Sequence, residues 1–419
     1  MPAGGLDGPE PAGDSAPVFT PRDLAGPACW IDPAAEAVRT LPRAPGVLER
    51  VAVRFLRRQV ARRPAPVGPI ADPVHILTRA ERMELRRILE GAVARAFFAG
   101  FASAAFVASV ALWAKFHRFE ERLAYVGAAG LLTAVCEMVY LHRQHLLAML
   151  ALMRATGAQL VEESPDPSET TVHWQGQLAG AMARAALDLP DPVGIVEGID
   201  PWRETSLARL YVLVALYRLK RGLSRFAAEF VVKQAAPNAV VRILAPYAAL
   251  PVTAAWNVFV SWKILREARI RVLGPSASEE VFSRILADTT RLSEAGRMCL
   301  YRAVGMGIVL KRSVHPNLLA LLEGLVRRLG PVPSAHLDDR GRFLEVIAML
   351  SREEQVRALQ VLAVATVIDG RLQGRERVMI RQARRACGLS ERLNAVDRLL
   401  SRFSRGDPID ADLLDDLAR

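Results

Sequence analysis

The stretch that decides the fold is AFFAGFASAAFVASVALWAKFHRFEERLAYVGAAGLLTAVCEMVYL, residues 96–141. Residues 96–114 carry no charge, and after the polar segment KFHRFEER a second apolar run, 123–141, carries a single charge at Glu137. A helix of this length spans about 28 Å, which matches the hydrocarbon core of a bilayer. Two such runs joined by a short loop predict a transmembrane helical hairpin. The alternative is a pair of buried helices in a soluble fold.

The flanks of the two runs indicate how the hairpin is oriented. Aromatic rings that favour the membrane interface stand near the run ends, at Trp113, Tyr125 and Tyr140. Five arginines precede the first run, whereas the loop holds three basic residues, so the positive-inside rule predicts that both termini are cytoplasmic. The five arginines are Arg79, Arg82, Arg86, Arg87 and Arg95, and the loop residues are Lys115, Arg118 and Arg122.

Composition predicts an all-α chain and leaves the partner class open. Of the 419 residues 51% are hydrophobic but only 6% aromatic, and the commonest types favour helices. The net charge of +11 is consistent with nucleic acid, anionic lipid or an acidic partner, and equally with the arginine bias of a high-GC genome. No dense basic tract contains interleaved aromatic residues, so we expect no specific nucleic-acid binding. The four cysteines are isolated, which argues against zinc and disulfide frameworks and favours a reducing compartment.

The N-terminal quarter divides into a tail and a basic helix. Residues 1–46 are rich in Pro and Gly, contain no secretory signal pattern and are expected to be disordered. Residues 47–77 contain a basic amphipathic helix and a linker. This helix is a candidate for contact with an anionic membrane surface, and the alternative is a helix that packs on the protein with a solvated arginine face. The candidate contact residues are Arg54, Phe55, Arg57, Arg58, Arg62 and Arg63.

The hairpin region, 78–162, is followed by a predicted helical domain, 163–334, which opens with a linker at 163–170. Within it, residues 243–262 are again free of charge. Because Pro246 and Pro251 interrupt helices, we expect a buried or membrane-dipping pair of short helices there, with a third span as the alternative. The basic helix that follows is expected to end at Gly274-Pro275.

Glu137 is the one acid inside a predicted span. Such residues often mark ion or proton paths, and His142 and His145 follow within about two turns. A metal or proton site formed by these three residues is one hypothesis. The favoured interpretation is a carboxylate near the cytoplasmic interface that pairs with Arg95 or reaches water.

The C-terminal region, 335–419, is balanced in charge and begins its main helix with the capping box Ser351-Arg352-Glu353-Glu354. That helix leads into VIDGRLQGRE, residues 367–376, in which Asp369 and Glu376 flank two glycines. The two acids are candidate ligands for a divalent cation. A turn between two packed helices explains the same residues, since Gly370 suits a helix stop and Glu376 suits the first turn of the next helix.

This C-terminal pattern resembles the TerB (tellurite-resistance) helical family. The matching positions are Ala363, Ala365, Asp369, Gly370, Glu376, Gly388, Leu389 and Ser390. The resemblance implies an all-α module of bacterial stress and membrane-associated complexes, with suggested metal binding by acidic residues. The motif here is surrounded by arginines that weaken cation binding, namely Arg371, Arg375, Arg377 and Arg381.

The middle region resembles uncharacterised bacterial membrane proteins, a family without an assigned reaction. The residues that carry this resemblance are Trp256, Asn257, Glu267, Ala268, Arg269, Arg271, Leu273, Gly274 and Pro275. It implies a membrane location and little else.

The sequence predicts a protein that is not an enzyme, because no phosphate-binding loop, nucleophile elbow or metalloprotease motif is present. We therefore assign no catalytic residue, and no cofactor apart from a divalent cation in one alternative. The expected protein is a multi-pass scaffold or stress-response component of a bacterial inner membrane, with the lipid bilayer, a cytoplasmic protein and a second copy of the chain as partners. The alternatives are a metal- or ion-responsive membrane sensor and a transport-associated subunit.

Overall fold

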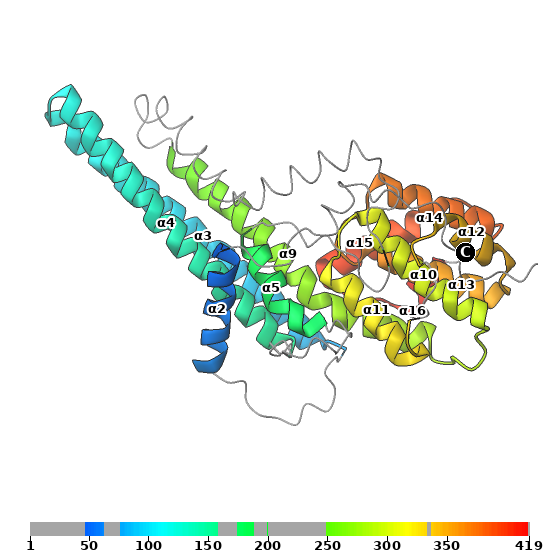
Figure 1. Cartoon of the computed structure of the whole chain (residues 1–419). Coiled ribbons are helices and arrows are strands. Elements are labelled where there is room, and N and C mark those ends of the chain that lie inside the picture. The colour runs from blue at the N-terminus through cyan, green and yellow to red at the C-terminus, as the bar shows by residue number, and fades with distance from the viewer. Residues whose placement is uncertain are drawn as a thin grey trace, which may run out of the picture.

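The computed structural model describes residues 47–62, 76–157, 174–187, 199, 249–332 and 337–417. The regular secondary-structure elements of these residues are all helices, which confirms the all-α fold class (Figure 1). The predicted tail 1–46 and the predicted linker 163–170 lie outside the described residues.

A long helical hairpin forms one end of the molecule (Figure 1). It consists of α3 (Arg79–Trp113), a 3-10 turn η1 (Ala114–Phe116) and α4 (Phe119–Ala155). The predicted capping box begins α3: the Thr78 hydroxyl accepts a hydrogen bond from the Glu81 N–H at 3.3 Å, and the Glu81 carboxylate accepts one from the Thr78 N–H at 2.7 Å. At the tip, the rings of Trp113, His117 and Tyr125 pack with centroids 4.3 to 5.3 Å apart.

The surface of this hairpin is largely apolar. Both helices, taken as Arg79–Phe116 and Phe119–Ala155, are long and apolar enough to cross a membrane. Small residues such as Gly100, Gly130 and Ala134 face the neighbouring helices and are buried. Within 96–141 many large apolar side chains point outward instead, and those exposed are Phe97, Phe98, Phe101, Phe106, Trp113, Phe116, Phe119, Leu123, Tyr125, Leu131, Leu132, Val135, Val139 and Tyr140.

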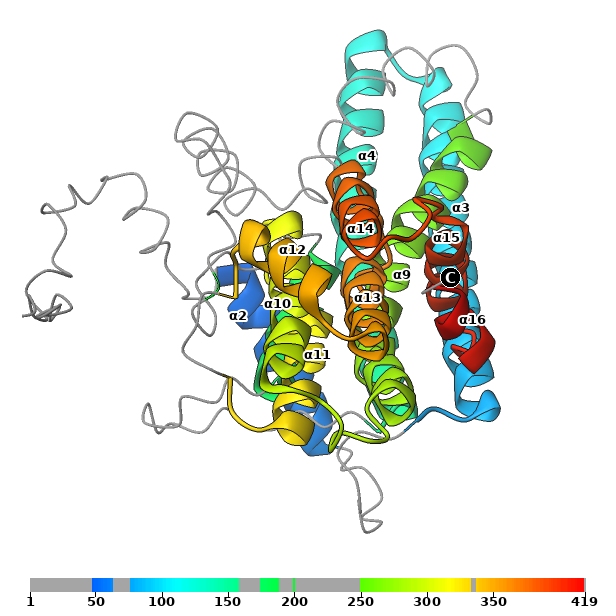
Figure 2. The same cartoon turned by 90° about the vertical axis from the view of Figure 1, so that its right-hand side faces the viewer.

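A third long helix, α9 (Ala249–Ile285), packs along α3 and α4 (Figure 2). From Ala249 onward the uncharged stretch is continuous helix, and residues 243–248, including Pro246, lie outside the described residues. Pro251 does not interrupt the helix, because it stands in the first turn, where its missing N–H breaks no helical hydrogen bond. The described part of α9 begins short of the hairpin tip.

The expectation that the helix ends at Gly274-Pro275 is wrong, because α9 continues to Ile285 with Pro275 inside it. Buried neighbours support the helix at this point. The Asn317 side chain donates to the Ile270 carbonyl at 2.9 Å, and the Ser278 hydroxyl donates to the Gly274 carbonyl at 2.9 Å. A side chain at Gly274 would overlap Asn317, whose Cγ lies 2.0 Å from an ideal Cβ.

Two shorter helices also pack against this bundle, and both contact α4. Helix α5 (Trp174–Ala186) packs between α9 and α2 (Val47–Arg62), the predicted basic helix. Ala52 and Leu56 of α2 are fully buried, and Glu49 pairs with Arg184 of α5 at 2.8 Å. The helix therefore packs on the protein.

Helices α10–α16 gather at the end of the molecule opposite the hairpin tip (Figure 1). They are α10 (Glu294–Lys311), α11 (Pro316–Leu329), α12 (Arg340–Met349), α13 (Arg352–Val367), α14 (Gly374–Ala386), α15 (Asn394–Arg405) and α16 (Ala411–Asp416). The predicted boundary at 335 separates α10 from the C-terminal helices in sequence, yet α10 packs directly against α13 and supplies fully buried residues to their core.

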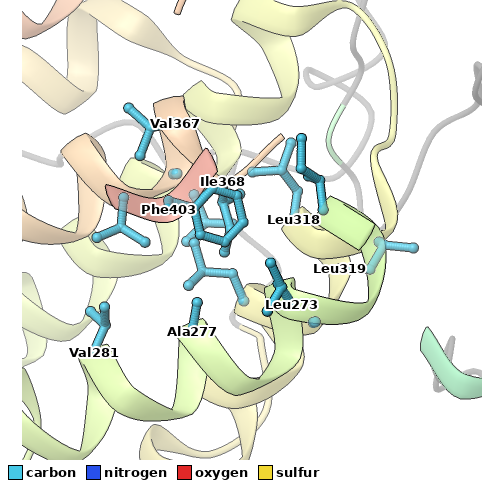
Figure 3. Packing of buried hydrophobic residues seen from close by; sticks show 14 of the residues in the cluster. Leu273, Ala277, Val281, Leu318, Leu319, Val367, Ile368 and Phe403 are labelled. Carbon is cyan, nitrogen blue, oxygen red and sulfur yellow. The ribbon is translucent and has the colours of Figure 1, made fainter. Parts of the chain in front are cut away.

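The core joins this C-terminal bundle to α9. Figure 3 shows Leu273 and Ala277 of α9 beside Leu318 of α11, Ile368 at the end of α13 and Phe403 of α15. All five side chains are at most 4% exposed. Continuous apolar packing of this kind transmits displacement of one helix to the others, because protein interiors are close-packed.

Candidate functional site

The fold brings Asp369 and Glu376 together at the turn between α13 and α14. Gly370 adopts the left-handed conformation (φ 74°) that closes the turn, and a side chain there would strike Ile270 of α9. The Glu376 carboxylate turns back to accept a hydrogen bond from the Gln373 N–H at 2.6 Å, as in a capping box. Both carboxylates then face the end of α10.

The place between these acids is taken by Lys311, the last residue of α10. Its ammonium group lies 2.7 Å from Asp369 Oδ1 and 2.6 Å from Glu376 Oε1, and it donates to the Thr366 carbonyl at 2.8 Å. The single ammonium group is thus shared between two carboxylates and a backbone carbonyl. In the described residues no group of three or more His, Cys, Asp or Glu side chains is arranged to hold a metal ion.

The ion pair is deeply buried. The side chains of Lys311 and Glu376 are 1% and 0% exposed, and that of Asp369 is 11% exposed. Burial raises the pKa of Glu376, while the charge of the Lys311 ammonium opposes that rise. The sequence offered one signal for this arrangement: a lysine ends an apolar helix in a chain whose basic residues are otherwise mostly arginine.

The same turn is held against α9 by polar contacts. Arg266 donates to the Gly370 carbonyl at 3.3 Å, and Arg371 pairs with Glu267 at 3.4 Å. The Asn317 amide bridges the two sides, because it donates both to the Ile270 carbonyl and, at 2.7 Å, to the Ile368 carbonyl. We call these contacts, together with the core of Figure 3, the α9 joint.

The second group of candidate residues lies within the hairpin. Glu137 is buried and accepts a hydrogen bond from the Asn257 amide of α9, and no ion pair between Glu137 and Arg95 is present in the described part of the chain. One or two turns further along both helices, His145 Nε2 lies 2.8 Å from the Ser261 hydroxyl, which is fully buried. Asn257 and Ser261, four residues apart, lie on one face of α9, and neither is among the predicted site residues.

The hairpin candidates Glu137, His142 and His145 do not form a single site, and they lie apart from Asp369 and Glu376. His142 is only half-buried, and the hydrogen bonds of Glu137 and His145 go to different α9 residues. Asp369 and Glu376 contact Lys311 at the far end of α10 instead. The structure therefore places two separate polar clusters, one between α4 and α9 and one at the α9 joint.

Gly100 allows α3 to approach the polar cluster between α4 and α9. A Cβ at this position would lie 2.5 Å from Asn257 Nδ2 and 3.0 Å from the Thr253 carbonyl oxygen, so the helix backbones leave no room for a side chain. We expect Gly100→Leu to lower the free energy of unfolding by about 1–3 kcal/mol through overpacking. Thermal unfolding of the full chain in detergent micelles measures this effect.

Gly127→Leu is the matched control for Gly100→Leu. Gly127 lies on the exposed face of α4, and no atom is within 4 Å of its ideal Cβ position. Its replacement should leave the unfolding temperature within a degree or two of the wild type. Equal effects of the two substitutions would show that α3 and α9 do not approach as closely as described.

The candidate membrane-surface residues of α2 divide into two groups. Arg54, Arg57 and Arg58 are exposed, whereas Phe55 is half-buried and packs against the core. The side chain of Arg62 and the whole of Arg63 lie outside the described residues.

Two buried cysteines supply no reactive thiolate. Burial raises the pKa of the Cys299 thiol to about 12 and that of Cys387 to about 11. Both are therefore protonated at neutral pH and pack as small apolar side chains.

The geometry thus describes a structural ion pair at the α9 joint and a polar cluster between α4 and α9. Neither arrangement carries a recognisable catalytic constellation in the described residues. Comparison of the chain with protein-family models, with curated proteins and with solved structures finds no match.

Proposed function

We propose that this chain is a non-enzymatic scaffold anchored in a bacterial inner membrane, with the hairpin α3–α4 as its anchor. The observation that carries the proposal is the exposure of the hairpin. Only 28% of the most apolar stretch of α3 and 17% of that of α4 are buried. Soluble proteins rarely expose contiguous apolar surface on this scale, whereas a bilayer solvates it.

Helix α9 extends the apolar surface. Val252, Trp256, Phe259 and Trp262 are 37–67% exposed and lie on the part of α9 that packs beside the hairpin. This part, from Ala249 to Trp262, is about 20 Å long, which is shorter than the thickness of a bilayer core. In the proposed arrangement α9 enters the membrane beside the hairpin and connects it, through the α9 joint, to the C-terminal bundle.

The α9 joint is what makes a scaffold role reasonable. The C-terminal bundle, which contains the TerB-like segment, is fixed to a membrane-inserted helix by apolar packing and by the contacts of Asn317, Arg266 and Arg371. A partner bound to this bundle would be held at a defined distance from the membrane. Both termini and the bundle are placed in the cytoplasm in this proposal, following the positive-inside bias.

Membrane extraction tests the anchor. We expect the full chain to remain in the membrane pellet after carbonate at high pH and to float with lipid in a density gradient. Release of the whole chain by carbonate would contradict an integral anchor.

A metal-responsive sensor is the first alternative function, and the position of Lys311 bears on it. The ammonium group already lies between Asp369 and Glu376, so a divalent cation would have to displace a buried charge. We expect calorimetric titration of the full chain with calcium, magnesium, manganese or zinc to give no saturable heat at this site. Heat that is lost on Glu376→Gln would instead support the sensor.

A transport-associated role is the second alternative, and the buried Glu137–Asn257 pair is the observation that favours it. If the chain is a scaffold, we expect dye-loaded vesicles that contain the wild-type chain to leak protons no faster than vesicles without it. The dye is pH-sensitive and reports the proton flux. Glu137→Gln keeps an acceptor oxygen for Asn257 and removes the charge. Proton flux in the wild type that is abolished in this variant would establish the transport role.

A further inference from the structure

Contacts between the three long helices show which of their residues lie at the same position along the bundle axis. Gly100 of α3, Asn257 of α9 and Glu137 of α4 meet in one plane across the bundle. The His145–Ser261 contact lies further along α4 and α9 in the same direction, so these two helices are parallel to each other. Helix α3 runs the opposite way, because it forms the hairpin with α4.

Three basic residues lie on one side of this plane at nearly equal depth. Arg95 precedes Gly100 by five residues, Arg143 follows Glu137 by six, and Lys263 follows Asn257 by six. At 1.5 Å per residue, each is about 7.5–9 Å from the plane, and all three are displaced toward the C-terminal bundle. We call Arg95, Arg143 and Lys263 the basic collar.

The collar stands where the apolar surface ends. Arg95 and Arg143 are exposed, and Lys263 is partly exposed. Trp262, 45% exposed, is adjacent, with the Arg266 guanidinium 5.8 Å from its ring centre. Tryptophan and arginine at such a boundary are typical of the headgroup region of a membrane.

In the described residues no acid pairs with Arg95 or Arg143. Apart from Glu137, which accepts a hydrogen bond from Asn257, the sequence contains no Asp or Glu in 91–113, 123–155 or 249–266, the parts of the three helices at this level. Within the described residues, Arg95 and Arg143 have neither an ion-pair nor a hydrogen-bond partner. The nearest acids along the chain are already used, since Glu90 pairs with Arg86 and Glu267 with Arg271.

The hairpin tip differs in this respect. The loop there mixes Lys115, Arg118 and Arg122 with the acids Glu120 and Glu121. Among the described residues, exposed arginines without acids among their neighbours in sequence therefore lie beside the C-terminal bundle, at Arg95 and Arg143, and not at the tip. Lipid phosphates of the leaflet beside the bundle are the counter-charges within reach of them.

We propose that the basic collar binds anionic phospholipid headgroups and so enriches phosphatidylglycerol-type lipids around the hairpin. The inference rests on the proposed membrane anchor and deepens it by naming the lipid class. Arg95 and Arg143 present guanidinium groups, whose planar donors match phosphate oxygens, and Lys263 adds a third charge. The lipid bound by the collar belongs to the leaflet on the side of the C-terminal bundle, because the apolar surface begins directly beside the collar.

The test is native mass spectrometry of the full chain released from nanodiscs of phosphatidylcholine and phosphatidylglycerol in a 3:1 ratio. We expect the retained lipid to be enriched in phosphatidylglycerol by roughly tenfold over the bulk ratio, since each basic residue near a membrane surface adds measurable attraction. The triple variant Arg95→Gln/Arg143→Gln/Lys263→Gln should retain less than about twofold enrichment, which would establish the collar as the source.

The matched control removes the same charge elsewhere. Arg375, Arg381 and Arg392 are exposed on α14 and the loop after it, so their combined change to glutamine should keep the enrichment. Raising the salt to 0.5 M should reduce the enrichment of the wild type itself, because exposed charges are screened. Enrichment that survives in the collar variant, or wild-type lipid retained at the bulk ratio, would overturn the proposal. Failure of the chain to enter pure phosphatidylcholine nanodiscs would instead count against the anchor.

Discussion

Replacing Lys311 by methionine is expected to lower the free energy of unfolding by about 3–5 kcal/mol, the usual cost of removing one partner of a buried ion pair. Methionine fills a similar volume but leaves Glu376, which is fully buried, and Asp369 without their counter-charge. Chemical or thermal denaturation of the full chain in micelles measures the loss. The control is Arg398→Met, which breaks an exposed 2.8 Å pair with Asp416 and should cost less than about 1 kcal/mol.

The loss in Lys311→Met should depend on pH. Burial already raises the pKa of Glu376, and removing the ammonium group removes the charge that opposes this rise. The folded variant would then keep a proton that the unfolded chain releases above its ordinary pKa of 4.5, so its stability falls as the pH rises above that value. The deficit relative to the wild type should be larger at pH 8 than at pH 5. Equal deficits at both values would show that Glu376 is not the group left uncompensated.

A charge at the middle of each apolar run should abolish membrane insertion. Phe106 and Leu132 are 51% and 63% exposed and lie near the centres of the runs 96–114 and 123–141. In a bilayer each lysine at this depth costs roughly 2.5–3.5 kcal/mol, so Phe106→Lys/Leu132→Lys should move the chain from the carbonate-resistant fraction to the soluble or aggregated fraction. In a soluble protein the same exposed substitutions would be nearly neutral.

Met349→Lys serves as the control for this pair. Met349 is 75% exposed on α12, in the C-terminal bundle, so a lysine there stays in water and should leave membrane retention unchanged. A double variant that remains in the membrane as firmly as Met349→Lys would place Phe106 and Leu132 outside the bilayer.

The helical fold and several local details could be predicted from sequence because their causes are local. The capping boxes that begin α3 and α13 depend on residues three apart, at Thr78–Glu81 and Ser351–Glu354, and both are present. The left-handed Gly370 likewise follows from a helix that ends in Asp-Gly. The long apolar helices follow from the absence of charge over a bilayer length.

The partners of the buried charges could not be predicted, because they come from distant segments. Lys311 reaches Asp369 and Glu376 across 58 and 65 residues of sequence, and Asn257 reaches Glu137 across 120. Arg95 was the nearer candidate for Glu137, since the hairpin places the two at similar depth. The third helix, α9, packs against both α3 and α4 near Glu137, and its Asn257 amide binds the carboxylate in place of Arg95. No periodicity in 96–141 encodes that contact.

Membrane topology decides whether the hairpin α3–α4 spans the bilayer. Reporters that act on only one side of the membrane would be fused after residues 64, 118, 170, 300 and 419. We expect that only the fusion after 118, at the hairpin tip, reports from outside the cytoplasm. A fusion after 118 that reports from the cytoplasm would contradict the spanning hairpin, and fusions after 300 and 419 that report from outside would contradict the cytoplasmic position of the C-terminal bundle.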